Sequence, residues 1–272
     1  YRPMTCVINN LEFDHADIFD DLAAIQKQFH YLIRSVPGQG HLVVPHDCEA
    51  INAVLQRGCW STVTRVGGQT DWQVQDVAAD GSEFSLFFQS HCLGRVHWSQ
   101  IGVHNVFNAL SACAAAVHAG VSLEALVPAL SSFAGVSRRM EHVLTNQGLT
   151  VFDDFAHHPT AIASTLRSLR AKAGVKPITV FLECGSRTMQ QGIHRQALIE
   201  ALSLADQVLV LNHHKMDWSL DELVTASAVP VSGYKSVSVL LEGWQPDLNV
   251  QQYARLIVVF PMKTMLSQKN FF

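Results

Sequence analysis

The sequence predicts an α/β protein with two domains, and three observations support this prediction. The chain has 272 residues, more than a single domain of the commonest size. Its second half alternates short apolar runs with amphipathic ones, which is typical of a doubly wound parallel sheet with helices on both faces. Its first half begins in the same way and then changes to short runs in which apolar and polar residues partly alternate. Such runs indicate a small antiparallel sheet. We place the boundary at Phe133–Ser137, so the expected domains cover residues 1–134 and 135–272.

Composition excludes several classes of protein. Hydrophobic residues make up 48% of the chain and charged residues 15%, whereas a disordered chain combines low hydrophobicity with high net charge. The net charge is −4 without a long run of one sign, which argues against nucleic-acid binding. No apolar stretch approaches the ~18–20 residues that span a bilayer. The six cysteines include no C-x-x-C pair, and we interpret them as reduced thiols of a cytoplasmic protein.

Hydrophobic periodicity places the elements of the first domain. The longest is a helix over Asp17–Val36, whose apolar residues fall on one face and which Pro37-Gly38 ends. The dipeptide Asp80-Gly81 marks a hairpin between two of the alternating runs. The other expected elements are strands over Thr5–Asn9 and His41–Val44, a helix over Glu49–Arg57, the alternating runs Thr62–Val66, Trp72–Ala78, Phe84–Gln89 and Arg95–Ile101, and helices over Asn105–Ala119 and Leu123–Ser132.

The second domain is expected to alternate strands and helices. Gly174 ends the first of these helices, as a glycine often does just beyond a helix. The expected strands are Val143–Thr145, Leu149–Asp153, Ile178–Leu182, Val208–Leu211 and Leu256–Phe260, and the expected helices are Thr160–Ala173, His194–Leu204 and Leu220–Ala226.

Polar residues gather where the first strand ends. Asp14, His15 and Asp17 follow that strand, and ligands of open α/β sheets bind at the carboxyl ends of strands. One interpretation is therefore that these side chains hold a metal or a phosphate. The alternative is that Asp14 or Asp17 caps the next helix and that His15 is a surface residue.

Two further pairs of residues suggest nucleotide binding. Asn105 and Asn108 lie three apart at a helix start, so they share a face and offer amides to the adenine and ribose of a nucleotide. The alternative is that an asparagine caps the helix. Arg138 and Arg139 lie at the expected domain boundary, and guanidinium groups match phosphate geometry. The alternative interpretation is that the two arginines are a pair of solvated surface residues without a ligand.

The segment Asp153–Thr160 is the strongest local signal. Asp153, Asp154, His157 and His158 lie between a strand and a helix that Pro159 starts. Adjacent side chains diverge, so the two histidines do not serve one atom, and a purely structural account has an aspartate capping and a histidine exposed. The sequence contains no Gly-Lys dipeptide of a phosphate loop and no G-x-G-x-x-G, which disfavours a dinucleotide-binding redox domain.

These motifs, taken in order, resemble the Mur ligase family of bacterial cell-wall enzymes. The resemblance extends over residues 1–240 and rests on the runs NNLEFDHADIFDDLAAIQKQF (Asn9–Phe29), HNVFN (His104–Asn108) and VFDDFAHHPTAI (Val151–Ile162). It implies a truncated central ATPase domain over residues 1–134, with part of a parallel sheet, a small antiparallel sheet and helices. It also implies a Rossmann-like carboxy-terminal domain over residues 135–272. The chain starts at Tyr1 without an initiator methionine, which we interpret as a cut through something longer; the missing amino-terminal half then belongs to a longer chain, forms a separate chain or does not exist in the cell.

The resemblance implies an ADP-forming ligase of peptidoglycan recycling with the cofactors ATP and Mg²⁺. ATP phosphorylates the lactyl carboxylate of UDP-N-acetylmuramate, and the amine of the murein tripeptide L-Ala-γ-D-Glu-meso-diaminopimelate then attacks the acyl phosphate. Arg139 and His157 are the expected catalytic residues. The implied roles are His15 for Mg²⁺, Asn105 and Asn108 for adenine and ribose, Arg139 with Arg138 for the ATP phosphates, Asp154 for the ribose hydroxyls, His157 for the phosphate or acyl substrate, and Glu183, Ser186 and Arg187 for the tripeptide.

The sequence departs from the family pattern at three places. The phosphate loop is absent, and so is the Ser-Asn-Gly-Gly-Phe loop after the last strand, where Phe260–Lys263 stands. The tripeptide stretch reads ECGSRTM (Glu183–Met189), with Gly185 in the place of the usual arginine. In an extended loop, Arg187 would point to the same side as Gly185 and replace that arginine. A second hypothesis is therefore a non-catalytic remnant that binds nucleotide or peptide weakly.

We predict that this chain by itself does not turn over ATP. Without the phosphate loop it lacks the nest of backbone N–H groups and the lysine that hold the β- and γ-phosphates. The measurement is ADP release by the purified chain with UDP-N-acetylmuramate and the tripeptide, and its control is a blank without protein. Steady ADP release above the blank contradicts this prediction.

Overall fold

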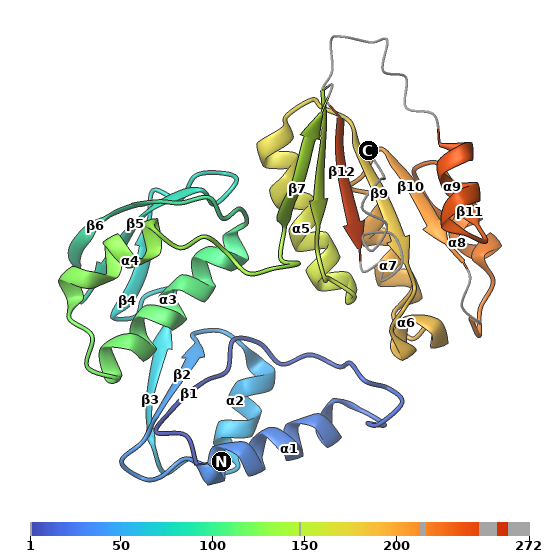
Figure 1. Cartoon of the computed structure of the whole chain (residues 1–272). Coiled ribbons are helices and arrows are strands. Elements are labelled where there is room, and N and C mark those ends of the chain that lie inside the picture. The colour runs from blue at the N-terminus through green and yellow to red at the C-terminus, as the bar shows by residue number, and fades with distance from the viewer. Residues whose placement is uncertain (1, 147, 213–215, 245–254, 261–272) are drawn as a thin grey trace. The chain divides into compact units, whose positions relative to one another are not determined.

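The computed structural model describes the chain except for residues 1, 147, 213–215, 245–254 and 261–272 (Figure 1). The chain forms two compact units, Tyr1–Ala134 and Gly135–Phe272. Within the described residues, no helix has the length and apolar character that crossing a membrane requires. The elements of the first unit are β1 (Thr5–Val7), α1 (Leu22–Ser35), β2 (His41–Pro45), α2 (Glu49–Gln56), β3 (Thr62–Val66), β4 (Trp72–Gln75), β5 (Glu83–Phe88), β6 (His91–His97), α3 (Val103–His118), a 3₁₀ turn (Leu123–Ala125) and α4 (Leu126–Ser131).

The first unit contains one six-stranded sheet in the order β1-β2-β3-β4-β5-β6. Strands β1, β2 and β3 are parallel, whereas β4, β5 and β6 are antiparallel. The expectation that Thr62–Val66 joins the antiparallel part is therefore wrong, because α2 carries the chain across and β3 pairs in parallel with β2. The hairpin prediction at Asp80-Gly81 is confirmed, since this dipeptide lies between the antiparallel strands β4 and β5.

The apolar periodicity predicted that the first long helix begins at Asp17. In the structure, helix α1 begins at Leu22. Asp21 is the N-cap residue, because its extended backbone lets its carboxylate accept a hydrogen bond from the backbone N–H of Ala24 at 2.7 Å. The backbone N–H groups of Ile18 and Phe19 instead donate to the carbonyl of His15, which forms a separate turn. The capping alternative for Asp14 and Asp17 is therefore also wrong.

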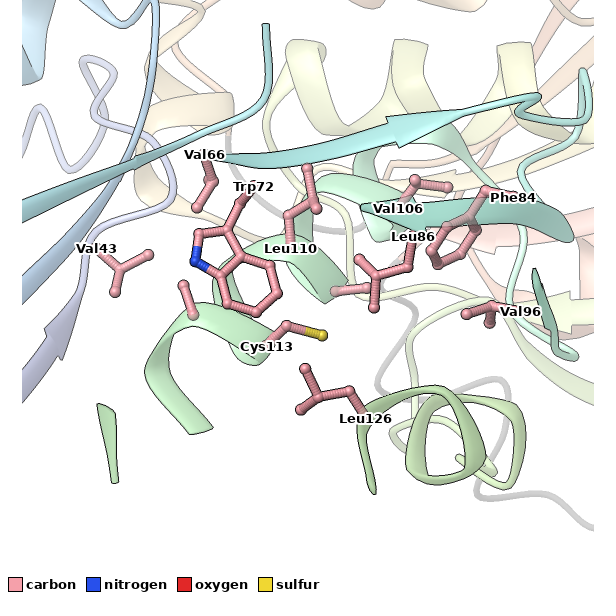
Figure 2. Packing of buried hydrophobic residues seen from close by; sticks show 12 residues of the cluster. Val43, Val66, Trp72, Phe84, Leu86, Val96, Val106, Leu110, Cys113 and Leu126 are labelled. Atoms are coloured by element: carbon pink, nitrogen blue, oxygen red, sulfur yellow. The ribbon is translucent and has the colours of Figure 1, made fainter. Parts of the chain in front are cut away.

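The core of the first unit fixes the position of α3. Along β2, alternate residues point to opposite faces, so Val43 packs into the cluster around Trp72, while Leu42 and Val44 pack into the cluster beneath α1 and α2. Figure 2 shows Leu110 and Val106 of α3 packed beside Trp72 and the strands. One face of α3 is therefore held by the sheet.

The second unit is a doubly wound sheet, as predicted. Its strand order is β11-β10-β9-β12-β8-β7, in which β7 is antiparallel to β8 and the other pairs are parallel. The elements β11, α6 and α9 were not predicted from the periodicity of the sequence. The elements are β7 (Glu141–Asn146), β8 (Leu149–Asp153), α5 (Pro159–Ala173), β9 (Ile178–Glu183), α6 (Arg187–Gln191), α7 (Arg195–Leu202), β10 (Gln207–Leu211), α8 (Leu220–Ala226), β11 (Val231–Tyr234), α9 (Val237–Gly243) and β12 (Arg255–Phe260).

The last strand in sequence lies in the middle of this sheet. Strand β12 pairs with β8 on one side and with β9 on the other (Figure 1). Its residue Val259 faces Asp153 in the register, and its carbonyl accepts a hydrogen bond from the backbone N–H of Asp154 at 3.1 Å. The carboxyl end of β8 is therefore an interior position of the sheet, where ligands of doubly wound folds bind.

A pair of histidines joins four elements at the amino ends of the parallel strands of the first unit. The rings of His41 (β2) and His118 (α3) stack with centroids 4.5 Å apart. The Nε2 atom of His41 lies 2.6 Å from the hydroxyl of Thr64 (β3), and the Nδ1 atom of His118 lies 2.7 Å from the hydroxyl of Thr5 (β1). The pair therefore has a part in holding α3 to the sheet.

We predict that the first unit loses stability as the pH falls from 7.5 to 5 and that His41→Gln removes part of this dependence. Burial, and secondarily the charge of His118, lowers the pKa of His41 below its ordinary value of 6.5. At lower pH the unfolded chain therefore binds more protons at His41 than the folded chain does. The stability that depends on a neutral His41 is therefore present above pH 6.5, and it is lost as the pH falls through the lower pKa that His41 has in the folded chain.

The measurement is the urea midpoint at both pH values, followed by tryptophan fluorescence. His91→Gln changes an exposed histidine of the same unit and is the matched control, which should keep the pH dependence of the original chain. An equal pH dependence in His41→Gln and in the original chain contradicts the prediction.

Candidate functional site

Three asparagine side chains of the first unit form a directed chain of hydrogen bonds. The Nδ2 atom of Asn9 donates to Oδ1 of Asn108 at 2.8 Å, and Nδ2 of Asn108 donates to Oδ1 of Asn105 at 3.2 Å. The Nδ2 atom of Asn105 donates to the carbonyl of Ile101 at 2.8 Å. Asn105 and Asn108 therefore share a face, and neither caps the helix, because Gly102 is the N-cap of α3. The amide orientation of each is set by its neighbours.

His15 lies in the loop after β1, with a positive φ of 54°. Its backbone N–H donates to Oδ1 of Asp14 at 2.7 Å. Among the described residues, no three histidines, cysteines, aspartates or glutamates lie close enough together to hold a metal ion. Asp14, His15 and Asp17 therefore do not form a complete Mg²⁺ site, and His15 as a single ligand stays a prediction.

The arginine pair precedes β7, and its two members have different surroundings. The Nε atom of Arg138 donates to Oδ2 of Asp153 at 3.1 Å. Arg139 is exposed, and no hydrogen bond or ion pair of its side chain occurs within the described part of the chain. Both guanidinium groups lie over the ring of Phe155, at 5.2 and 5.6 Å from its centroid. The two arginines are therefore not equivalent.

Asp154 is buried and anchors the loop after β8. Its Oδ1 atom accepts from the backbone N–H of Ala156 at 2.8 Å, and its Oδ2 atom accepts from the hydroxyl of Thr165 in α5 at 3.0 Å. Burial raises the pKa of Asp154, while these two hydrogen bonds and the charge of Arg139 oppose the rise. Each oxygen of a carboxylate can accept two hydrogen bonds, so Asp154 can still accept from ribose hydroxyls beside Ala156 and Thr165. The ribose contact at Asp154 stays a prediction.

The two histidines of this loop point to different partners, as expected of adjacent side chains. The Nδ1 atom of His157 lies 3.0 Å from the carbonyl of Phe155, and its ring meets the Phe155 ring edge to face. His158 is the N-cap of α5, where its Nδ1 accepts from the backbone N–H of Thr160, and its ring meets that of His194. Pro159 follows as the first residue of the helix, as predicted.

The stretch Glu183–Met189 differs from the extended loop that the sequence analysis assumed. Glu183 is the buried last residue of β9, and Ser186 is the N-cap of the short helix α6, where its Oγ accepts from the backbone N–H of Met189. Arg187 is the first residue of that helix, so it does not point to the same side as Gly185 by strand alternation. The argument for Arg187 from extended geometry is therefore wrong. Residues 261–263, which the sequence analysis also singled out, lie outside the described residues.

Two residues that sequence reasoning missed hold α6 in place. Arg187 pairs with Asp217 at 3.5 Å, and both side chains are about half exposed, at 50% and 45%. The indole N–H of Trp218 donates to the carbonyl of Met189 at 2.9 Å. Asp217 and Trp218 follow Arg187 by about thirty residues, and no local pattern links them to it.

Comparison with known proteins gives the family. Residues 1–116 match the family model described as the Mur ligase middle domain, and residues 138–261 match the model described as the Mur ligase glutamate ligase domain. The chain belongs to the Mur ligase family. The resemblance inferred from the sequence motifs and the predicted fold class are thereby confirmed, with mixed and parallel sheets in Mur ligase middle and carboxy-terminal domains.

Two curated relatives are named UDP-N-acetylmuramate–L-alanyl-γ-D-glutamyl-meso-2,6-diaminoheptandioate ligase. The Escherichia coli (strain K12) protein is 44% identical over 243 residues, which is 89% of this chain and 53% of the relative. The Haemophilus influenzae protein is 40% identical over 232 residues, which is 85% of this chain and 51% of the relative. This Mur ligase chain therefore spans about half the length of the curated relatives it matches.

A solved structure agrees with these matches. The crystal structure of a murein peptide ligase from Psychrobacter arcticus 273-4 superposes with a TM-score of 0.67 at 35% sequence identity. The similarity covers 96% of this Mur ligase chain and 55% of that chain. The fold of this Mur ligase chain is therefore similar to that of the murein peptide ligase.

We predict that Thr165→Val lowers the free energy of unfolding of the second unit by about 1–2 kcal/mol at pH 7. The substitution keeps the shape of the side chain but removes a hydroxyl donor from a buried carboxylate. The measurement is urea unfolding. Ser168→Ala removes a hydroxyl from the same helix that donates to the carbonyl of Ser164, and this control should have a smaller effect. Equal stability of Thr165→Val and the original chain contradicts an anchoring role for Asp154.

Proposed function

We propose that this chain serves an ATP-dependent, ADP-forming ligase that joins UDP-N-acetylmuramate to L-Ala-γ-D-Glu-meso-diaminopimelate in the cytoplasm during peptidoglycan recycling. The observation that carries the proposal is the 44% identity to the Escherichia coli ligase whose name states these substrates. The cofactors proposed with it are ATP and Mg²⁺, as the family resemblance implies. The described residues do not complete a Mg²⁺ site around His15, so we derive no step through the metal.

Arg139 is the residue proposed to bind the phosphates of the nucleotide. When bound, ATP supplies the phosphoryl group that activates the carboxylate of UDP-N-acetylmuramate. The guanidinium of Arg139 is exposed, lies over Phe155 and has no hydrogen bond within the described part, so its donors are available to phosphate oxygens. His157 lies two residues after Phe155 in the loop that follows β8 and is proposed to lie near the transferred phosphate or the acyl group.

Asn105, Asn108 and Asp154 are proposed to bind the nucleoside. The hydrogen bonds from Asn9 and to Ile101 hold the two amides of α3 in one orientation, so little conformational freedom is lost when adenine or ribose binds. Asp154 offers its remaining lone pairs to ribose hydroxyls. Its hydrogen bonds to Ala156 and Thr165 keep it in place for this role.

Glu183, Ser186 and Arg187 are proposed to bind the tripeptide. Arg187 is the cation of this stretch, and a carboxylate of the diaminopimelate end is its natural partner. Because Asp217 already pairs with Arg187 at 3.5 Å, an incoming carboxylate competes with it. Both groups are half exposed, so this ion pair is weak and is readily exchanged.

A chimera tests the proposed function. In it, this chain replaces the matched half of the Escherichia coli ligase, and we expect ADP release that requires both UDP-N-acetylmuramate and the tripeptide. In the chimera, Arg139→Ala should lower kcat/KM by about 100-fold or more, because it removes a charge-assisted contact to the transferring phosphoryl group. Arg167→Ala, at an exposed position of α5, is the matched control.

Two outcomes contradict the proposal. A correctly folded chimera that releases no ADP favours the second hypothesis, a non-catalytic module with weak nucleotide or peptide binding. ADP release that does not depend on the tripeptide assigns a different amine substrate.

We predict that Asp217→Asn tightens binding of the tripeptide a few-fold and that Arg187→Ala weakens it. The first substitution removes the carboxylate that competes for Arg187, and the second removes the cation. For the original chain we expect a Kd no tighter than about 1 mM. The measurement is calorimetry with L-Ala-γ-D-Glu-meso-diaminopimelate.

Arg195→Ala is the matched control for this pair. Arg195 forms an ion pair with Glu222 on neighbouring helices of the same unit, and its removal should leave tripeptide binding unchanged. Micromolar binding that Arg187→Ala does not alter places the peptide pocket elsewhere.

A further inference from the structure

The turn before β7 is held in an unusual backbone conformation. Arg138 has a φ of 59° and Met140 a φ of 49°, in the left-handed region that non-glycine residues rarely adopt. Such residues occur where surrounding contacts fix them. In this turn, the contacts fix Arg138 and leave Arg139 between two left-handed residues.

Four hydrogen bonds hold this turn, one of them from the backbone N–H of Arg139 to the carbonyl of Val136 at 3.1 Å. The backbone N–H of Arg138 and the hydroxyl of Ser137 donate to the same oxygen, Oε2 of Glu141, at 2.7 and 2.8 Å. These bonds lower the pKa of Glu141. The carbonyl of Arg138 accepts from the backbone N–H of Phe155 at 2.8 Å. The turn is therefore attached both to the start of β7 and to the loop after β8.

The side chain of Arg138 continues this attachment into the buried end of β8. Its Nε donates to Oδ2 of Asp153, whose side chain is only 5% exposed. Its Nη2 and Oδ1 of Asp153 are buried and have no hydrogen-bond partner among the described residues. These two atoms are the ones that would complete a two-pronged contact between the groups. A small closing movement of Arg138 would form it.

Arg139 has the opposite surroundings. Its guanidinium lies over the same Phe155 ring as that of Arg138, at 5.6 Å, but it is exposed and has no hydrogen bond or ion pair within the described residues. Two cations over one ring repel each other unless one of them is neutralised. Asp153 pairs with Arg138, whereas the charge of Arg139 acts on Asp154 without a hydrogen bond or ion pair, so the donors of Arg139 are available to an anion.

We propose that Arg138 is a positioning residue: its contacts to Asp153 and Phe155 hold Arg139 in place to bind the phosphates of the nucleotide, which Arg138 itself does not touch. This inference rests on the phosphate-binding role of Arg139 under the proposed function. It divides between two residues a role that the sequence pattern gave to the arginine pair as a whole.

The first test observes the arginine Nε–H signals of the ¹⁵N-labelled 272-residue chain by NMR while inorganic triphosphate is added. We expect the Arg139 signal to shift on addition and the Arg138 signal to stay in place. A concentration-dependent shift of the Arg138 signal equal to that of Arg139 makes Arg138 a direct ligand and overturns the proposal. The titration itself uses the unsubstituted chain, and substitutions serve only to assign the two signals.

The second test is a double-mutant cycle on triphosphate affinity. Arg138→Gln should weaken binding about tenfold in the original chain and have no effect when Arg139→Gln is already present, because a positioning residue acts only through its partner. Arg138→Lys should restore little of the loss, since an ammonium lacks the planar fork. Equal effects of Arg138→Gln in both backgrounds overturn the proposal.

Asp153→Asn separates positioning from simple charge. The substitution removes a negative charge near the anion, so long-range electrostatics alone would tighten triphosphate binding. The proposal predicts weaker binding instead, because Arg138 loses its anchor. Tighter binding overturns it. Arg167→Gln, on the exposed face of α5, is the control for the loss of one cation.

Failure of the proposed function gives a different result from failure of this inference. If Arg139→Gln leaves triphosphate affinity unchanged, the phosphate role of Arg139 is wrong and the positioning role falls with it. If Arg139→Gln weakens binding but Arg138→Gln and Asp153→Asn do not, the proposed function stands and only the positioning role is wrong.

Discussion

Asp153, the last residue of β8, and Asp154, the first residue of the loop that follows it, hold different partners. Asp153 accepts from Arg138, and Asp154 accepts from Ala156 and Thr165. One carboxylate thereby holds the arginine turn, and the other holds the loop that leads into α5. Burial raises the pKa of both carboxyl groups, and their hydrogen-bond donors oppose this rise.

In the first unit, the two faces of helix α3 have different roles in positioning its polar residues. The core around Trp72 holds one face of α3, and the amide chain from Asn9 through Asn108 to Asn105 runs along another. Packing fixes where the helix lies, whereas the hydrogen bonds fix which end of each amide is a donor. Neither alone would present a defined pattern of donors and acceptors to a ligand.

The arginine residues illustrate how much of the candidate site could be predicted. The motif around Arg138 and Arg139 was evident from the sequence, because paired guanidinium groups at a domain boundary suggest anion binding. Their unequal surroundings were not evident, since they depend on Asp153, fifteen residues from Arg138. The position of Arg187 was misjudged for the same reason: Ser186 starts a helix there, and the ion-pair partner Asp217 comes from a distant loop.

The sequence by itself determined the periodic features of this protein: the alternation of strands and helices, the start of α5 at Pro159, its end at Gly174 and the motifs of a Mur ligase. These follow from local effects, because apolar spacing and capping act over a few residues. Only the tertiary structure decided that β12 lies between β8 and β9 and that β3 is parallel to β2. Strand pairing and the choice of partner for a charged side chain depend on residues far apart in the chain, which local patterns do not encode.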